Sequence, residues 1–345
     1  MNKSTDKVNV LITSYLEPEH VERIRQVDAR LEVIYRPDLI PSPRYAADHT
    51  GPAKDLSDKQ EIEWRKLLNE AEILFDFDFQ RKEILPELAP NLRWIQATSA
   101  GIGQFVNRLN YAERMPEVIF TMASGVHARP LAEYVIMSMI MHYKGFMRII
   151  EDKRNHRWER YAGTDLENRT IGLVGLGRIG SQVAIFARAL GMKVIGTNSK
   201  LVENIVDEFY DPASLKDMLP KCDVLVLTVP HIPETEKMIG KIELDLLPND
   251  AFLINIARGM VVDEDALIEA LKSGMLGGAA LDVFAEEPLP EASPLWDMPN
   301  VLISPHSTST SDRENLRITD LFVDNLQRYL SGQQLRNVLN VKLMY

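Results

Sequence analysis

The stretch that decides the fold is Thr170-Ile-Gly-Leu-Val-Gly175-Leu-Gly177-Arg-Ile-Gly180. Its apolar first half predicts a short strand, and the residues that follow predict a helix. Gly175 permits the tight turn, Gly177 lets the backbone approach a pyrophosphate, and Gly180 lets the helix pack closely on the strand. A pyrophosphate bound there would meet the backbone N–H groups at the positive end of the helix. The stretch therefore predicts a dinucleotide-binding loop, the alternative being a glycine turn without a ligand.

Short apolar runs recur regularly in the part of the chain that contains this loop. Six of them follow Arg169, the number of strands in the two βαβαβ halves of a doubly wound dinucleotide-binding domain. They are Ile171–Val174, Val194–Thr197, Val224–Thr228, Ala251–Asn255, Ala279–Val283 and Val301–Ser304. One earlier run, Val118–Thr121, is assigned to the same part, because the boundary is expected near Met115–Pro116.

The first part of the chain also alternates between strand and helix patterns. Helices are expected at Pro18–Ala29 and Gln60–Ala71, and Pro37–Lys54, with its four prolines, is expected to be a long loop. The expected strands are Val8–Thr13, Leu31–Tyr35, Ile73–Phe75 and Leu92–Gln96. Such alternation predicts an α/β fold with parallel sheets.

The last helix, Asp312–Leu330, comes after the last strand of the second part and is expected to return to the first domain. The expected division is a discontinuous substrate domain, residues 1–116 plus 308–345, and a dinucleotide-binding domain, residues 117–307. We expect two Rossmann-like or flavodoxin-like domains, with the active site in the cleft between them.

Composition narrows the function classes. The 345 residues include 39 Lys+Arg and 50 Asp+Glu, so the formal net charge is −11, which argues against nucleic acid or an anionic membrane as partner. The single cysteine, Cys222, rules out an internal disulfide and disfavours a cysteine-based metal site, so no metal is expected. No run approaches the ~18 apolar residues of a membrane helix. The N-terminus lacks the pattern of a signal peptide, and a cytoplasmic location is expected.

The end of the second strand of the dinucleotide-binding domain bears on cofactor choice. An NAD site usually has Asp or Glu there to accept from the ribose 2′-OH, but this chain has Asn198-Ser199-Lys200. Asn198 and Ser199 can donate hydrogen bonds to a 2′-phosphate, and Lys200 adds a positive charge. These residues favour NADP(H). The alternative is that they are ordinary loop residues and that NAD(H) binds with weaker ribose recognition.

Polar residues follow three of the predicted strands. Arg258 comes after Ala251–Asn255, Glu287 after Ala279–Val283 and His306 after Val301–Ser304. Ligands of open α/β sheets bind just beyond the carboxyl ends of strands, so these three side chains are candidate site residues. Arg and Glu are common residues, and the pattern alone is weak.

The sequence motifs around these three residues make the pattern specific. They include Asn255-Ile-Ala-Arg258-Gly259, Leu281-Asp-Val-Phe-Ala-Glu-Glu287-Pro-Leu-Pro290 and Ser304-Pro-His306. With Trp158, Val229-Pro-His-Ile-Pro-Glu-Thr235 and the closing Asn325-Leu-Gln-Arg-Tyr-Leu-Ser-Gly332, the chain resembles the D-isomer-specific 2-hydroxyacid dehydrogenase family along nearly its whole length. The resemblance points toward the glyoxylate/hydroxypyruvate reductases of that family.

The resemblance implies a catalytic set that agrees with the chemistry of 2-keto acid reduction. Arg258 would bind the substrate carboxylate through its planar guanidinium. His306 would give and take the proton, since imidazole exists in both protonation states near neutral pH. Glu287 would orient His306 and stabilise its imidazolium form. The expected product is the D-2-hydroxy acid.

The resemblance also implies residues that bind the cofactor and the substrate. Asp282 would bind the nicotinamide carboxamide, and Ser99, Ala100 and Gly101 would hold the substrate carboxylate with Arg258 and His306, although a simple glycine turn is the alternative for that loop. The expected cofactor-binding residues are Gly175, Gly177, Arg178, Ile179, Gly180, Asn198, Ser199, Lys200, Val229, Pro230, Thr235, Ile256, Ala257, Arg258, Asp282 and His306.

The sequence is also compatible with two other functions. A dinucleotide-sensing corepressor without turnover and a phosphite-type dehydrogenase share this kind of fold by resemblance. A homodimer through the dinucleotide-binding domain is expected on the same ground. The run Ser307-Thr-Ser-Thr-Ser311 stands where the family often has a small pair and then Gly, which bears on substrate choice. Roles for His127 and Arg129 are left open.

Overall fold

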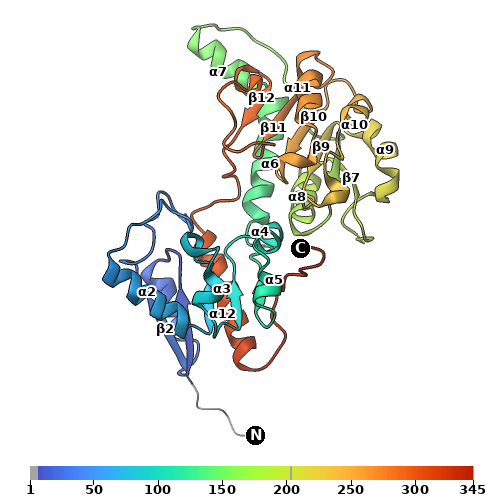
Figure 1. Cartoon of the computed structure of the whole chain (residues 1–345). Coiled ribbons are helices and arrows are strands. Elements are labelled where there is room, and N and C mark those ends of the chain that lie inside the picture. Colours follow the sequence, from blue (N-terminus) through green and yellow to red (C-terminus); the bar gives the residue numbers. More distant parts are fainter. Residues whose placement is uncertain (1–6, 203, 345) are drawn as a thin grey trace. The chain divides into compact units, whose positions relative to one another are not determined.

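The computed structural model describes residues 7–202 and 204–344 and divides the chain into two compact units. Unit 1 consists of the chain up to His127 and from Thr310 onward, and unit 2 is Ala128–Ser309 (Figure 1). Each unit is an α/β structure on a parallel sheet, so the predicted fold class is confirmed.

Unit 1 has a parallel sheet of order β2-β1-β3-β4-β5, the flavodoxin-like order. Its strands are β1 Val8–Ile12, β2 Leu31–Tyr35, β3 Ile73–Phe75, β4 Trp94–Gln96 and β5 Ile119–Thr121. Its helices are α1 Pro18–Arg25, α2 Asp58–Glu70, α3 Leu85–Leu88, α4 Gly103–Arg108, α5 Tyr111–Arg114 and α12 Glu314–Leu330. Helices α2 to α5 supply the apolar core on one face of the sheet, while α1 and α12 supply the other.

Helix α12 is the last helix of the chain and packs in unit 1, as the sequence predicted (Figure 1). Its buried residues include Ile318, Phe322 and Leu326, which recur on one face at helical spacing. The Phe322 ring lies 5.1 Å from the rings of both Phe75 and Trp94, measured between centroids. Aromatic packing against two strands therefore fixes this late segment on a sheet built from the start of the chain.

The position of β5 differs from the sequence-based prediction. Ile119–Thr121 pairs in parallel with β4, with Trp94 opposite Ile119, so this strand completes the sheet of unit 1. The prediction that this run opens the second part was wrong. The contacts divide the chain between residues 127 and 128 and between residues 309 and 310, where the expected boundaries were 116/117 and 307/308.

Unit 2 has a parallel sheet of order β12-β11-β10-β9-β6-β7-β8. Its strands are β6 Thr170–Val174, β7 Lys193–Thr197, β8 Glu208–Tyr210, β9 Val224–Leu227, β10 Phe252–Asn255, β11 Gly278–Leu281 and β12 Val301–Ile303. Its helices are α6 Ala128–Tyr143, α7 Phe146–Arg154, α8 Arg178–Ala189, α9 Leu215–Met218, α10 Lys241–Asp245 and α11 Glu264–Lys272. Helices α6 and α8 cover one face of the sheet, and α9, α10 and α11 cover the other.

The sequence predicted six strands for this sheet and missed β8. Glu208-Phe-Tyr210 is a three-residue edge strand whose side chains are all only partly buried. It therefore lacks the continuous apolar run that marks the inner strands of a parallel sheet. With β8 included, the chain runs outward from β6 through β7 to β8 and then crosses back to β9. The strand order reverses between β6 and β9, which is where doubly wound sheets bind their ligands.

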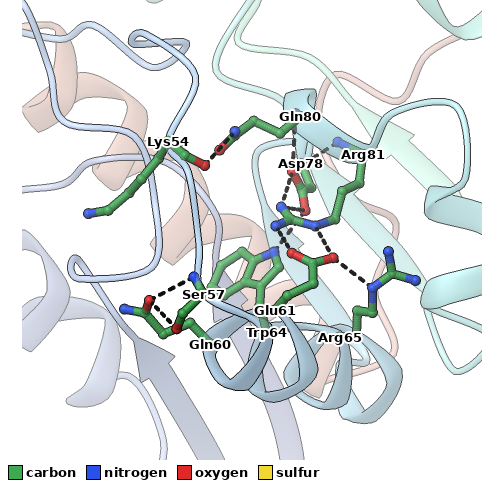
Figure 2. Close-up of polar contacts among 9 residues, drawn as sticks. All are labelled: Lys54, Ser57, Gln60, Glu61, Trp64, Arg65, Asp78, Gln80 and Arg81. Atoms are coloured by element: carbon green, nitrogen blue, oxygen red, sulfur yellow. Dashed lines mark hydrogen bonds and ion pairs between the residues drawn. The ribbon is translucent and has the colours of Figure 1, made fainter.

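The long loop of unit 1 is held by polar contacts, since residues 36–57 contain no helix or strand. Within it, the Asp48 carboxylate accepts hydrogen bonds from Arg44 Nε at 2.7 Å and from the backbone N–H of Gly51 at 3.1 Å. Near its end, the backbone oxygen of Lys54 accepts a hydrogen bond from Gln80 Nε2 at 3.1 Å (Figure 2). The loop is thus tied to the turn that follows β3.

A charged network pins that turn to α2. Asp78 accepts a hydrogen bond from Trp64 Nε1 at 2.8 Å and pairs with Arg81 at 3.1 Å (Figure 2). Arg81 also pairs with Glu61 of α2, which accepts a further hydrogen bond from Arg65 at 2.6 Å. Hydrogen bonding to Arg81 is the largest cause of a lowered pKa of Glu61, which falls to about 2 from 4.5.

Replacing Glu61 should therefore cost stability in a pH-dependent way. Because the folded-state pKa is the lower one, the contribution of Glu61 is complete above its unfolded value of 4.5 and is lost as the pH falls toward 2. We expect Glu61→Gln to lower the free energy of unfolding by about 1 kcal/mol at pH 7. Urea unfolding should show this difference shrinking between pH 5 and pH 3. Glu113→Gln, at an exposed position of the same unit, is the control. A Glu61→Gln difference of constant size at all pH values would contradict the role of the charge.

Candidate active site

The glycine loop lies between β6 and α8, at the point where the strand order of unit 2 reverses. Gly175 has φ +100°, a conformation that favours glycine, and a Cβ there would lie 2.8 Å from Thr228 Oγ1, beyond β9. At Gly180, a Cβ would lie 2.1 Å from the backbone oxygen of Gly175. Both glycines are therefore required by the protein's own packing.

Gly177 is different, because a Cβ added there would meet nothing within 4 Å. This glycine is the N-cap of α8, and its backbone oxygen accepts the hydrogen bond from Ser181 N at 2.9 Å that begins the helix. The backbone N–H groups of the first helical turn have no partners within the helix and suit an anion. Open space beside a helix N-terminus fits a dinucleotide pyrophosphate, which would approach the backbone where a side chain is missing.

The residues expected to contact the ribose lie next to this loop. Asn198 follows β7, and its Oδ1 accepts a hydrogen bond from Leu176 N at 3.2 Å. Its Nδ2 donates to the backbone oxygen of Lys200 at 3.0 Å. Ser199 and Lys200 are exposed. Asn198 thus fixes the turn after β7 against the glycine loop, and no carboxylate stands at the end of this strand.

The segment after β9 is held by its own hydrogen bonds. Thr235 Oγ1 donates to the backbone oxygen of Pro230 at 2.7 Å and accepts from Ile232 N at 2.9 Å. Val229 packs against the core beneath α9, α10 and α11. Thr235 therefore shapes the loop that follows the strand-order reversal.

Strands β10, β11 and β12 are neighbours in the parallel sheet, so their carboxyl ends lie at one edge. Arg258, Glu287 and His306 follow these three strands in that order. The structure brings the side chains of Glu287 and His306 into contact, and the charge of Glu287 acts on the pKa of Arg258.

Arg258 is positioned by backbone contacts. The buried Asn255 donates through Nδ2 to the backbone oxygen of Arg258 at 3.1 Å and accepts from Ala257 N at 3.0 Å. Ile256 and Ala257 are each 5% exposed, and a Cβ on Gly259 would lie 1.9 Å from the backbone of Phe284. The turn is therefore packed tightly against the segment that follows β11. Burial lowers the pKa of Arg258, while the charges of Glu287 and Asp282 act in the opposite direction.

Glu287 and His306 form a directed pair. Glu287 Oε1 accepts a hydrogen bond from Phe284 N at 3.1 Å, and Oε2 lies 2.8 Å from His306 Nδ1. A carboxylate only accepts hydrogen bonds, so Nδ1 carries the proton in this contact. The imidazole is 44% exposed, and its Nε2 is the nitrogen left to act on another molecule. A histidine held in this way can donate or accept a proton at Nε2.

The Asp282 carboxylate contacts the turn that carries His306. It accepts hydrogen bonds from Ser304 Oγ, from Ser307 N at 3.0 Å and from Thr308 Oγ1 at 2.6 Å. Sequence reasoning assigned Asp282 to the nicotinamide and did not identify these contacts.

In unit 1, the expected substrate loop follows β4. Ser99, Ala100 and Gly101 are exposed, and Gly101 N donates to Ser99 Oγ at 3.2 Å. His127 is paired locally, with its Nε2 3.1 Å from Glu314 Oε1, and Arg129 pairs with Glu133 at 2.7 Å on α6.

Two features are absent from the part of the chain that the structure describes. Over residues 7–202 and 204–344, no group of three or more His, Cys, Asp or Glu side chains could hold a metal ion. Within the same ranges, no helix has both the length and the apolar character needed to cross a membrane.

Comparison with known proteins assigns the family. Residues 136–308, which cover most of unit 2, match the model of the D-isomer specific 2-hydroxyacid dehydrogenase NAD-binding domain. The chain belongs to the D-isomer-specific 2-hydroxyacid dehydrogenase family. It is an NAD(P)-dependent oxidoreductase of that family, and the match places the NAD(P)-binding domain in unit 2.

Relatives in the dehydrogenase family extend this result to most of the chain. Glyoxylate/hydroxypyruvate reductase B of Pectobacterium atrosepticum is 36% identical over 265 residues, 74% of this chain and 81% of the relative. A Xanthobacter autotrophicus family member in complex with NADPH and MES superposes with a TM-score of 0.78 at 25% identity, covering 99% of this chain and all of that one. The NADPH-dependent glyoxylate/hydroxypyruvate reductase of Sinorhizobium meliloti, in complex with NADP and sulfate, gives 0.76 at 26% identity, covering 98% and 100%.

Gly177→Ala should weaken dinucleotide binding without affecting the fold of this dehydrogenase. A methyl group at Gly177 contacts nothing in the protein but occupies the space that the pyrophosphate would enter. We expect an unchanged melting temperature and an NADPH affinity at least ~10-fold weaker in a fluorescence titration. Gly240→Ala, at the N-cap of α10, is the matched control. Unchanged affinity in Gly177→Ala would place the pyrophosphate elsewhere.

Proposed function

We propose that this protein reduces a small 2-keto acid to the D-2-hydroxy acid with NADP(H). The observation that carries the proposal is the directed pair of Glu287 and His306, together with the partly buried Arg258, on whose pKa the charge of Glu287 acts. Reduction of a keto acid requires an anchor for the carboxylate and a proton donor for the carbonyl oxygen, and these side chains supply both functions.

Each residue has a defined part in the proposed reaction. Arg258 binds the substrate carboxylate and polarises the neighbouring carbonyl. A reduced nicotinamide, when bound, would supply the hydride that C2 accepts. As the carbonyl electrons move to oxygen, His306 Nε2 supplies the proton that completes the hydroxyl group. Glu287 keeps the imidazole ring oriented through Nδ1 and stabilises the imidazolium form before transfer.

The remaining site residues are proposed on the same basis. Ser99, Ala100 and Gly101 would bind the substrate carboxylate, an assignment supported by the exposure of this loop. Asp282 would bind the carboxamide of the cofactor. The remaining proposed cofactor residues are Gly175, Gly177, Arg178, Ile179, Gly180, Val229, Pro230, Thr235, Ile256 and Ala257.

NADP(H) is favoured over NAD(H) by the end of β7. Asn198 stands where NAD-binding domains usually have a carboxylate, and the exposed Ser199 and Lys200 add a donor and a positive charge. A carboxylate would repel the 2′-phosphate, whereas these groups attract it. The Xanthobacter and Sinorhizobium structures contain NADPH and NADP, which agrees with this preference.

His306→Ala tests the catalytic proposal. We expect kcat with glyoxylate or hydroxypyruvate to fall at least ~100-fold, because the general acid is removed. NADPH affinity, measured by fluorescence titration, should change little. His156→Ala, at an exposed histidine of the same unit, is the control. If His306→Ala retained most of its activity, the assigned proton donor would be wrong.

Asn198→Asp tests the cofactor proposal. The aspartate keeps the oxygen that accepts from Leu176 N but places a negative charge beside the ribose. We expect the ratio of kcat/KM for NADPH to that for NADH to fall at least ~10-fold, since the 2′-phosphate is repelled. Initial rates with both cofactors measure this ratio. An unchanged ratio would exclude Asn198 from ribose recognition.

We also propose a homodimer formed through unit 2. Exposed apolar side chains on α6 and α7 support it, namely Met137, Ile140, Phe146, Met147 and Ile149. Light scattering of the purified chain should give twice its mass of 39.2 kDa. A monomer mass at micromolar concentration would contradict this part of the proposal.

A further inference from the structure

The turn that contains His306 donates several hydrogen bonds to one buried carboxylate. Asp282 directly follows β11, and its side chain belongs to a residue that is 2% exposed. The four donors to this carboxylate come from the segment 304–308 after β12. They are Ser304 Oγ, Ser307 N at 3.0 Å, Thr308 N at 3.2 Å and Thr308 Oγ1 at 2.6 Å.

His306 sits in the middle of this segment in a conformation that needs support. Its φ is +52°, in the left-handed region, which costs a non-glycine residue about 1 kcal/mol. Its backbone N–H donates to the backbone oxygens of Asp282 at 2.9 Å and of Ser304 at 3.0 Å. The imidazole is 44% exposed, so burial does not fix the ring. Hydrogen bonds to Asp282 and Glu287 therefore determine where the ring lies.

The two side-chain donors, Ser304 and Thr308, bind different oxygens of the Asp282 carboxylate. Ser304 Oγ and both backbone donors bind Oδ1 of Asp282, which leaves little acceptor capacity on that oxygen. Thr308 Oγ1 is the donor to Oδ2. Thr308 thus closes the turn on the far side of His306 and fixes the rotation of the carboxylate that the other donors share.

We propose that Thr308 is a positioning residue for the reaction. Its hydroxyl anchors the turn to Asp282 and so keeps His306 Nδ1 on Glu287 and Nε2 toward the substrate. The effect that this inference predicts on kcat rests on the proposed function. The position of the His306 ring can be measured without turnover.

Thr308→Val tests the anchor, because valine keeps the shape of threonine and removes the hydroxyl. We expect kcat to fall ~10- to 100-fold, the order expected when a catalytic group is misplaced by about 1 Å. The KM for NADPH should change less than kcat does, because the Asp282 carboxylate keeps three of its four donors. Thr308→Ser keeps the hydroxyl and should restore most of kcat. Thr164→Val makes the same substitution at an exposed threonine of unit 2 and should behave like the parent chain.

A spectroscopic readout separates this proposal from the proposed activity. Long-range 1H–15N spectra of the 15N-histidine-labelled chain, at a pH where the ring is neutral, report which nitrogen of His306 carries the proton. The signal is assigned by its loss in His306→Ala. The parent chain and Thr308→Ser should show the Nδ1-protonated form that Glu287 selects, and Thr308→Val should show a mixture of both forms.

Each outcome of these experiments either supports or contradicts the role proposed for Thr308. A mixed tautomer in Thr308→Val alone supports the anchor, even if no keto acid is turned over and the proposed function fails. The same tautomer in the parent chain and Thr308→Val, or an equal change in Thr164→Val, would overturn it. A fall in kcat that Thr308→Ser fails to restore would also overturn it, because the hydroxyl would then be irrelevant.

Discussion

Parallel strands bring their carboxyl ends to one edge of a sheet, and the candidate site of unit 2 depends on this constraint. Strands β10, β11 and β12 are adjacent, so residues that are distant in sequence emerge side by side. The same rule puts the glycine loop after β6 beside Thr228 after β9. Hydrogen bonds within these loops then supply the finer positioning, from Asn255 beneath Arg258 to Asp282 beneath His306.

Much of the fold could be predicted from the sequence, because the inner strands of parallel sheets are buried on both faces and appear as continuous apolar runs. β8 escaped prediction because an edge strand with partly buried side chains has no such run. β5 was predicted as a strand but assigned to the wrong sheet. Its partner, β4, is determined by register across the sheet, which the local pattern of Ile119–Thr121 does not encode.

Prediction of the site from the sequence was limited in the same way, because contacts between distant segments are not visible in a local pattern. Residue types after strand ends, with the motifs around them, made Arg258, Glu287 and His306 candidates, and in the structure Glu287 Oε2 lies 2.8 Å from His306 Nδ1. The Ser/Thr run after His306 was visible as a departure from the family, but its partner was not. Thr308 binds Asp282, and pairing between the loops after two different strands depends on their three-dimensional paths. The same holds for Asn198, whose side chain also supports the glycine loop.

The central claim is that the site reduces 2-keto acids with NADPH. Its most direct test is the initial rate of NADPH and NADH oxidation by the purified chain with glyoxylate, hydroxypyruvate, pyruvate and phenylpyruvate. We expect clear turnover of at least one keto acid, faster with NADPH than with NADH, with the preferred acid reporting the size of the pocket. The absence of turnover with either cofactor and all four acids, in a chain that binds NADPH, would contradict the account.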